Sequence, residues 1–143
     1  MTDVREALFV GRTTDGRTVR RPLSPHLQVY KLHMIMVMSG SHRITGMALG
    51  LGSLLMVWFL VAAAASDAAF GWATWALGSP IGLLALIGWT GSLWYHFCNG
   101  IRHLVWDTGR GMDLPTMYAS AVRVLIAAAA LTVITWIVVF AVR

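Results

Sequence analysis

The chain has 143 residues, of which 57% are hydrophobic and only 12% are charged. Because soluble domains carry about a quarter charged residues, this composition excludes most soluble enzymes and indicates one small integral membrane domain. The net charge of +5 reports topology in such a protein and does not indicate nucleic-acid binding. The single cysteine, Cys98, excludes an intrachain disulfide and a cysteine-based zinc or iron–sulfur site.

Residues 1–31 are expected to form an extended cytoplasmic arm. The segment mixes basic and acidic residues and has no apolar core, which argues against a secretory signal peptide. Pro22 and Pro25 favour an extended run toward the membrane over a helix.

Three stretches without charged residues predict three spanning helices. They cover residues 44–65, 68–101 and 124–142. About 20 apolar residues cross the roughly 30 Å of hydrocarbon, so the middle stretch is too long for one span. It is interrupted at Gly78-Ser79-Pro80, and we therefore expect a loop over residues 66–79, with Trp72 and Trp75 at the membrane surface.

The predicted fold is all-α and integral to the membrane. An extended cytoplasmic arm at residues 1–31 precedes a three-helix membrane anchor at residues 32–143. The expected spans are approximately 38–65, 80–106 and 117–142. Because three helices of this size enclose little interior, a partner in the membrane is also expected.

The distribution of basic residues predicts the orientation. Arg102, Arg110 and Arg123 bound the second loop, whereas the first loop contains only Asp67. The N-terminus and the second loop are therefore expected in the cytoplasm, and the C-terminus at Arg143 outside.

His96 is the deepest ionisable residue of the predicted spans. At 1.5 Å per residue it lies roughly 16 Å inside the level of Asp107. A neutral imidazole at this depth offers a lone pair to a metal, the alternative being a hydrogen bond to a facing helix. His96, Gly100, His103 and Asp107 share one stripe of the helix, and Gly100 leaves room for a flat cofactor or a packed helix.

The first predicted span has a matching stripe. Ser39, Arg43, Gly46 and Gly50 recur at intervals of four, three and four residues. Gly46 and Gly50 form a G-x-x-x-G pattern, which predicts close helix packing. At the cytoplasmic edge, His42 and Arg43 either extend to lipid headgroups or bind an anionic group or a carbonyl.

A six-coordinate haem would need a second ligand from elsewhere. His96 and His103 lie about 10.5 Å apart along one helix and cannot bind its two faces. The second ligand would be His33 or His42 of this chain, or a histidine of another chain.

Three segments resemble the cytochrome b556 family of succinate dehydrogenase, the large membrane anchor of respiratory complex II. Residues 21–30 resemble its R-P-x-S-P-H-x-x-x-Y segment, and residues 39–46 its S-x-x-H-R-x-[TS]-G signature. Residues 96–107 resemble its H-x-x-x-G-x-R-H-x-x-x-D segment. The segments occur in the family's order, on the family's three-span plan.

The resemblance implies the roles of individual residues. His96 is implied as an axial ligand of the iron of haem b, shared with a histidine of a second anchor subunit. Ser39 and Arg43 are implied to bind ubiquinone or another quinone. His42, Arg43 and His103 are implied to contact the haem propionates.

The implied protein is a subunit of succinate:quinone oxidoreductase in the bacterial cytoplasmic (inner) membrane. Its partners would be the second anchor subunit, an iron–sulfur subunit and a flavoprotein subunit. The chain carries no flavin or iron–sulfur motif, so no succinate-oxidising centre and no catalytic residue is expected on it, and Asp107 has no assigned role. The alternatives are a small transporter or channel subunit, and a self-contained b-type cytochrome using His42 with His103.

Overall fold

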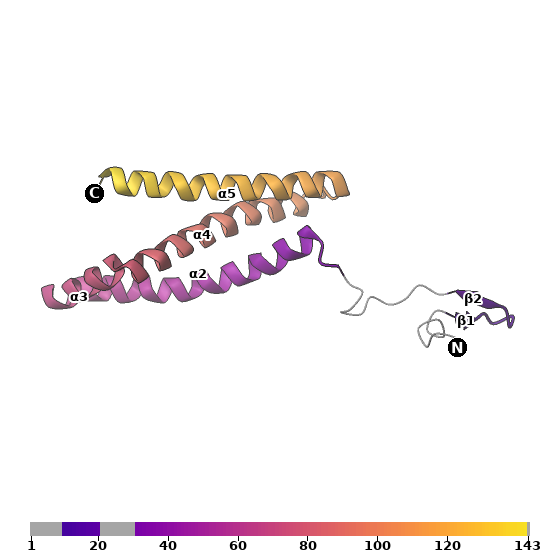
Figure 1. Ribbon diagram of the computed structural model, residues 1–143, viewed down its shortest axis with the longest axis horizontal. Helices are drawn as coiled ribbons and strands as arrows, with labels where there is room; N and C mark the ends of the chain where they lie inside the picture. Colours follow the sequence, from indigo (N-terminus) through magenta and orange to yellow (C-terminus); the bar gives the residue numbers. More distant parts are fainter. Residues whose placement is uncertain (1–9, 21–30, 143) are drawn as a thin grey trace. The chain divides into compact units, whose positions relative to one another are not determined.

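The structure is a computed structural model that describes residues 10–20 and 31–142, divided between two units, Met1–Leu32 and His33–Arg143. In the first unit, strands β1 (Val10–Arg12) and β2 (Thr18–Arg20) pair antiparallel, as Figure 1 shows. Gly16 closes the turn with a φ of 79°, a left-handed conformation that favours glycine. The hairpin differs from an all-α fold, and it is the main described part of the arm that was predicted at residues 1–31. The segment at 21–30, with Pro22 and Pro25, lies outside the described residues.

Three long apolar helices make up most of the second unit (Figure 1). They are α2 (Met34–Ala65), α4 (Pro80–Asp107) and α5 (Leu114–Val142). Each is long and apolar enough to cross a membrane, so the prediction of three such helices is confirmed. At 1.5 Å per residue they are about 42–48 Å long, which exceeds the hydrocarbon thickness of roughly 30 Å.

The predicted loop at residues 66–79 is wrong, because most of it forms a fourth helix, α3 (Asp67–Gly78). Ser66 caps this helix, its hydroxyl accepting a hydrogen bond from the Ala69 N–H at 3.2 Å. The Gly-Ser-Pro interruption does end α3, and the Ser79 hydroxyl then accepts the Gly82 N–H at 3.1 Å to start α4. Local capping therefore allows two helices to meet where a loop was expected.

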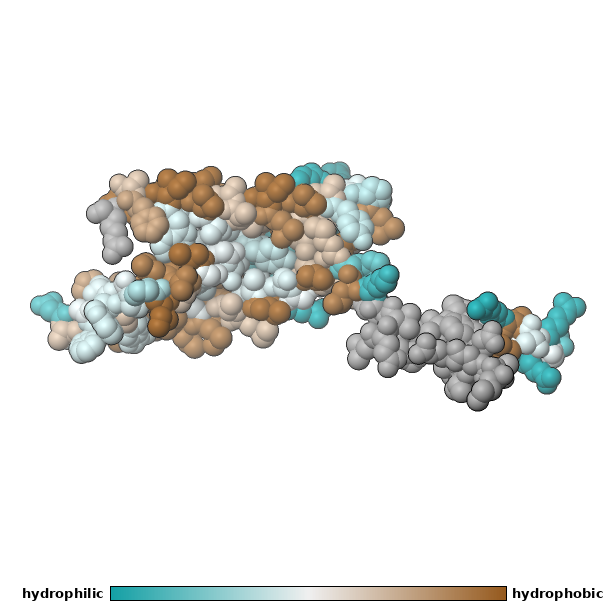
Figure 2. Space-filling view, in the orientation of Figure 1, coloured by the Kyte–Doolittle hydropathy of each residue, from teal (hydrophilic) through white to brown (hydrophobic). Residues whose placement is uncertain are grey.

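Helix α4 lies between α2 and α5 and packs against both (Figure 1). A small core joins the three helices, with Met38 of α2 buried against Ala121 and Val124 of α5. Figure 2 shows apolar residues along the exposed sides of α2 and α5 and hydrophilic residues near the ends of the bundle. Such an outward apolar surface is what a hydrocarbon environment requires.

The connection between α4 and α5 is short and tied to α4. Gly109 and Gly111 adopt φ values of 76° and 73°, which favour glycine. The Trp106 indole donates a hydrogen bond to the Gly111 carbonyl at 3.1 Å. Asp113 caps α5 by accepting the Thr116 N–H at 3.0 Å. Hydrogen bonds from the side chain and the backbone of Thr116 lower the pKa of Asp113.

The glycines of α2 have different surroundings. A Cβ on Gly46 would lie 3.1 Å from His96 Cε1, and a Cβ on Gly52 would overlap the Trp89 indole. A Cβ on Gly50 would meet nothing within 4 Å. Within this chain, Gly46 of the G-x-x-x-G pattern is closely packed and Gly50 is not, and α4 also approaches α2 closely at Gly52.

Candidate functional site

Three histidines meet between α2 and α4. The rings of His42 and His96 are stacked, with centroids 3.9 Å apart and planes 11° from parallel. The ring of His103 is tilted by 40° to that of His42, at a centroid distance of 5.2 Å. His96 and His103 lie two turns apart on α4, and the imidazole of His42 contacts both of them. The structure thus brings together three candidates that the sequence placed on two separate helices.

The hydrogen bonds of His96 assign its tautomer. Its Nδ1 lies 3.0 Å from the carbonyl oxygen of His42 and 3.3 Å from the hydroxyl of Thr45. A carbonyl can only accept, so Nδ1 carries the proton. The Thr45 hydroxyl lies 2.9 Å from the Ser41 carbonyl and 3.0 Å from that of His42, so it donates there and accepts from His96. In the neutral ring, Nε2 of His96 is then the nitrogen that offers a lone pair.

The surroundings of these rings contain an unpaired polar atom and open space. Nδ1 of His42 is buried and has no hydrogen-bond partner among the described residues. A Cβ on Gly100, one turn from His96, would meet nothing within 4 Å. The site therefore has an unpaired ring nitrogen on α2 and, at Gly100 of α4, space that no side chain of the described residues fills.

The described residues contain no group of three or more His, Cys, Asp and Glu residues suited to hold a metal ion. Imidazole lone pairs lie in the ring plane, and the stacked rings of His42 and His96 do not direct their nitrogens to one point. A haem iron needs fewer protein ligands than a bare metal ion, because the macrocycle supplies four nitrogens and a b-type haem can be held by one histidine from each side. The donor set present fits a haem better than a bare ion.

Ser39 and Arg43 lie one helical turn apart on α2 and near the histidines in sequence. Ser39 is half-buried and Arg43 is exposed. The described residues provide no hydrogen bond or ion pair to the Arg43 guanidinium. His33 occupies the exposed N-cap position of α2, and Asp107 is the exposed last residue of α4, so neither belongs to the histidine cluster.

A polar cluster, whose contacts were not predicted from the sequence, lies on the side of α4 that faces α5. Arg102 is only 6% exposed, and its Nε donates to the Ser120 hydroxyl at 2.8 Å. Its other nitrogens donate to the Met117 carbonyl at 2.9 Å and the Asn99 amide oxygen at 3.4 Å. The guanidinium lies 4.1 Å from the centroid of the Trp106 ring. The spacing of Asn99 and Arg102, three residues apart in an apolar helix, was the available signal.

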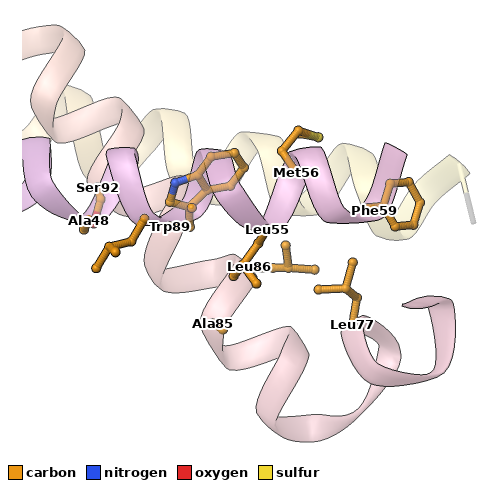
Figure 3. A pocket seen from close by; sticks show the side chains of 11 residues that line it. Ala48, Leu55, Met56, Phe59, Leu77, Ala85, Leu86, Trp89 and Ser92 are labelled. Atoms are coloured by element: carbon orange, nitrogen blue, oxygen red, sulfur yellow. The ribbon is translucent and has the colours of Figure 1, made fainter. Parts of the chain in front are cut away.

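An apolar pocket of about 450 Å³ lies between α2, α3 and α4 (Figure 3). Trp89 and Phe59 are among its walls, and Ser92 lines it one turn from His96. The other residues that line it are Ala48, Leu51, Gly52, Leu55, Met56, Leu77, Ala85 and Leu86. The three histidines do not line it, so it is separate from their cluster.

Comparison with known proteins gives consistent results. Residues 17–135 match the family model described as succinate dehydrogenase/fumarate reductase transmembrane subunit. The succinate dehydrogenase cytochrome b556 subunit of Paracoccus denitrificans is 43% identical over 120 residues, covering 84% of this chain and 92% of that protein. The corresponding subunit of Rickettsia bellii is 34% identical over 119 residues, covering 82% and 92%.

A mitochondrial relative gives the same match. The succinate dehydrogenase cytochrome b560 subunit of Sus scrofa is 38% identical over 134 residues, covering 86% of this chain and 79% of that protein. With a family model over most of the chain and relatives of this identity, the chain belongs to the succinate dehydrogenase/fumarate reductase transmembrane subunit family and is a membrane anchor of complex II.

Proposed function

We propose that this anchor binds haem b through Nε2 of His96, and that a histidine of the second anchor subunit supplies the other axial ligand. The observation that carries the proposal is the hydrogen bond from Nδ1 of His96 to the His42 carbonyl. Metal-binding histidines commonly donate their second ring N–H to a carbonyl, which orients the ring and makes the ligating nitrogen more basic. When bound, the haem supplies one-electron chemistry.

The residues around His96 are suited to hold the propionates. His42 has a buried Nδ1 without a partner among the described residues. Arg43 follows it in the sequence, and His103 contacts the ring of His42. Carboxylates accept charge-assisted hydrogen bonds from such groups, so we assign propionate contacts to these three residues.

Ser39 and Arg43 are proposed to form this chain's part of the quinone site. Reduction of a quinone places negative charge on its carbonyl oxygens before protons arrive. A hydroxyl and a guanidinium one helical turn apart stabilise that charge by hydrogen bonding and electrostatics. The electrons would come from succinate through the flavoprotein and iron–sulfur subunits, and this chain would have no succinate-oxidising centre of its own.

We propose that the N-terminus and the loop at residues 108–113 face the cytoplasm, with α3 at the opposite surface. Arg102, Arg110 and Arg123 surround that loop, and Lys and Arg favour the cytoplasmic side. The bacterial relatives support the cytoplasmic (inner) membrane as the location. The dehydrogenase subunits would then dock on the face nearest Ser39 and Arg43.

Substitution of single histidines in the assembled complex tests the proposal. His96→Ala is expected to abolish the six-coordinate b-type spectrum or to lower the haem content strongly. His103→Ala, on the same helix, removes a proposed propionate contact and no ligand, and is expected to keep the six-coordinate spectrum. A His96→Ala complex with an unchanged spectrum would remove His96 as a ligand. A purified complex with no b-type spectrum at all would refute haem binding by this anchor.

A further inference from the structure

We propose that Thr45, acting with the backbone carbonyl of His42, is a positioning residue that fixes the tautomer and direction of the His96 ring. This inference rests on the proposed role of His96 as an axial ligand and extends it. Thr45 would contact the ligand and not the iron. It is assigned a role here because its hydroxyl is the second acceptor for the same ring nitrogen.

The hydroxyl of Thr45 can serve only as an acceptor toward His96. Its oxygen lies 2.9 Å from the Ser41 carbonyl oxygen and 3.0 Å from the His42 carbonyl oxygen, and both of these atoms can only accept a hydrogen bond. Once the hydroxyl hydrogen is used there, the remaining lone pair faces Nδ1 of His96 at 3.3 Å. The oxygen therefore favours the tautomer with the proton on Nδ1 and disfavours the reverse.

Three neighbouring features of α2 form a cradle for the His96 ring. They are the carbonyl of His42, the hydroxyl of Thr45 and the bare Cα of Gly46, at positions i, i+3 and i+4 on one helix face. A Cβ at Gly46 would lie 3.1 Å from Cε1 of His96, closer than an ordinary contact. The missing side chain lets the ring approach the two acceptors on α2, the backbone carbonyl of His42 and the side-chain hydroxyl of Thr45.

A second acceptor on Nδ1 changes the ligand and not only its orientation. Electron density returned to the ring makes Nε2 more basic, and a more basic axial ligand stabilises ferric over ferrous haem. Removing the Thr45 oxygen is therefore expected to raise the haem midpoint potential. Loss of such an outer partner typically lowers metal-site affinity by roughly 10-fold or more, so haem should also dissociate more readily.

The test compares three variants in the purified complex. Thr45→Val removes the oxygen at nearly constant volume, and Thr45→Ser restores it. Thr90→Val is the matched control, since the Thr90 hydroxyl also bonds a carbonyl one turn back in its helix, that of Leu86 at 2.7 Å. The measurements are the haem midpoint potential by redox titration and the ratio of haem to protein.

We expect a higher potential and about 10-fold weaker haem retention in Thr45→Val. Thr45→Ser and Thr90→Val should resemble the unsubstituted protein. A Thr45→Val complex with an unchanged potential overturns the inference, as does an equal change in Thr90→Val. If Thr45→Val does not assemble, Gly46→Ala provides the second test, because its methyl group moves the ring away from the acceptors. An unchanged potential in Gly46→Ala then overturns the inference.

Failure of this inference is distinguishable from failure of the proposed function. A His96→Ala complex that keeps its haem spectrum refutes the assignment of the ligand. A complex in which His96→Ala loses haem, while Thr45→Val keeps the potential of the unsubstituted protein, refutes only the positioning role.

Discussion

The imidazole of His42 lies face to face with that of His96, at a centroid distance of 3.9 Å. Their lone pairs lie in nearly parallel planes, so the two rings do not ligate one iron in this arrangement. We therefore expect His42→Ala to keep the low-spin, six-coordinate spectrum that His96→Ala loses. Absorption and electron paramagnetic resonance spectra of the two purified variants make this comparison. Loss of six-coordination in His42→Ala would make His42 the candidate second ligand in place of a histidine of the second anchor subunit.

Arg43→Ala and Ser39→Ala are expected to slow electron transfer to quinone by about 10²-fold, because one donor to a developing oxyanion is worth roughly 3 kcal/mol. Electron transfer to an artificial acceptor served by the dehydrogenase subunits should not change. Arg123→Ala, at an exposed arginine of α5, is the control. A proportional fall in both rates, or no fall in either, would contradict the quinone assignment.

The orientation predicts which added cysteines react from outside intact cells. In a Cys98→Ser background, a membrane-impermeant thiol reagent should label Trp72→Cys and should not label Arg110→Cys. Both parent residues are exposed, so accessibility within the fold does not bias the result. Labelling at position 110 and protection at position 72 would reverse the topology.

Ser120→Ala is expected to destabilise the protein by about 1.5–3 kcal/mol, because it removes a hydrogen bond from the buried Arg102 cation. Ser53→Ala is the control, since the Ser53 hydroxyl is exposed and bonds the carbonyl of Gly50 in its own helix. Thermal unfolding of both variants in the same detergent measures the difference. Equal melting temperatures for the two variants would contradict a stabilising role for the Arg102–Ser120 bond.

Asp113 makes a pH-dependent contribution to the stability of α5. Its pKa is lowered in the folded chain by hydrogen bonds from the Thr116 side chain and backbone. The stabilisation is therefore complete above the ordinary aspartate pKa of about 3.9 and is lost as pH falls through the lower folded value. The melting difference between the unsubstituted protein and Asp113→Ala should be constant near neutral pH and shrink below about pH 4. A difference that grows on acidification would contradict this sign.

The three long helices were predictable because a run of apolar residues is a local property of the sequence. Helix α3 was not predicted, because the Gly-Ser-Pro interruption at residues 78–80 suggested a loop over all of residues 66–79. The Ser66 cap makes the first part of this segment helical. The hairpin before the membrane had a signal in Asp15-Gly16, a pair typical of tight turns between strands.

The site was predictable only within each helix. The spacing of His96, Gly100 and His103 placed them on one face of α4, because helix periodicity is fixed. The contacts of His42 and Thr45 with His96 depend on how α2 is rotated and shifted against α4. That arrangement results from the whole interface, including the close approach of Trp89 to Gly52, and no single motif encodes it.

The partners of Arg102 also bear on how α4 and α5 enter the membrane during synthesis. Two of its hydrogen-bond acceptors, Met117 and Ser120, belong to α5, which follows α4 in synthesis. An unpaired cation is costly once it is removed from water, and the residues of α4 itself satisfy the Arg102 guanidinium only partly. Lateral release of α4 into lipid is therefore favoured once α5 has emerged beside it, and the two helices insert most favourably as a pair.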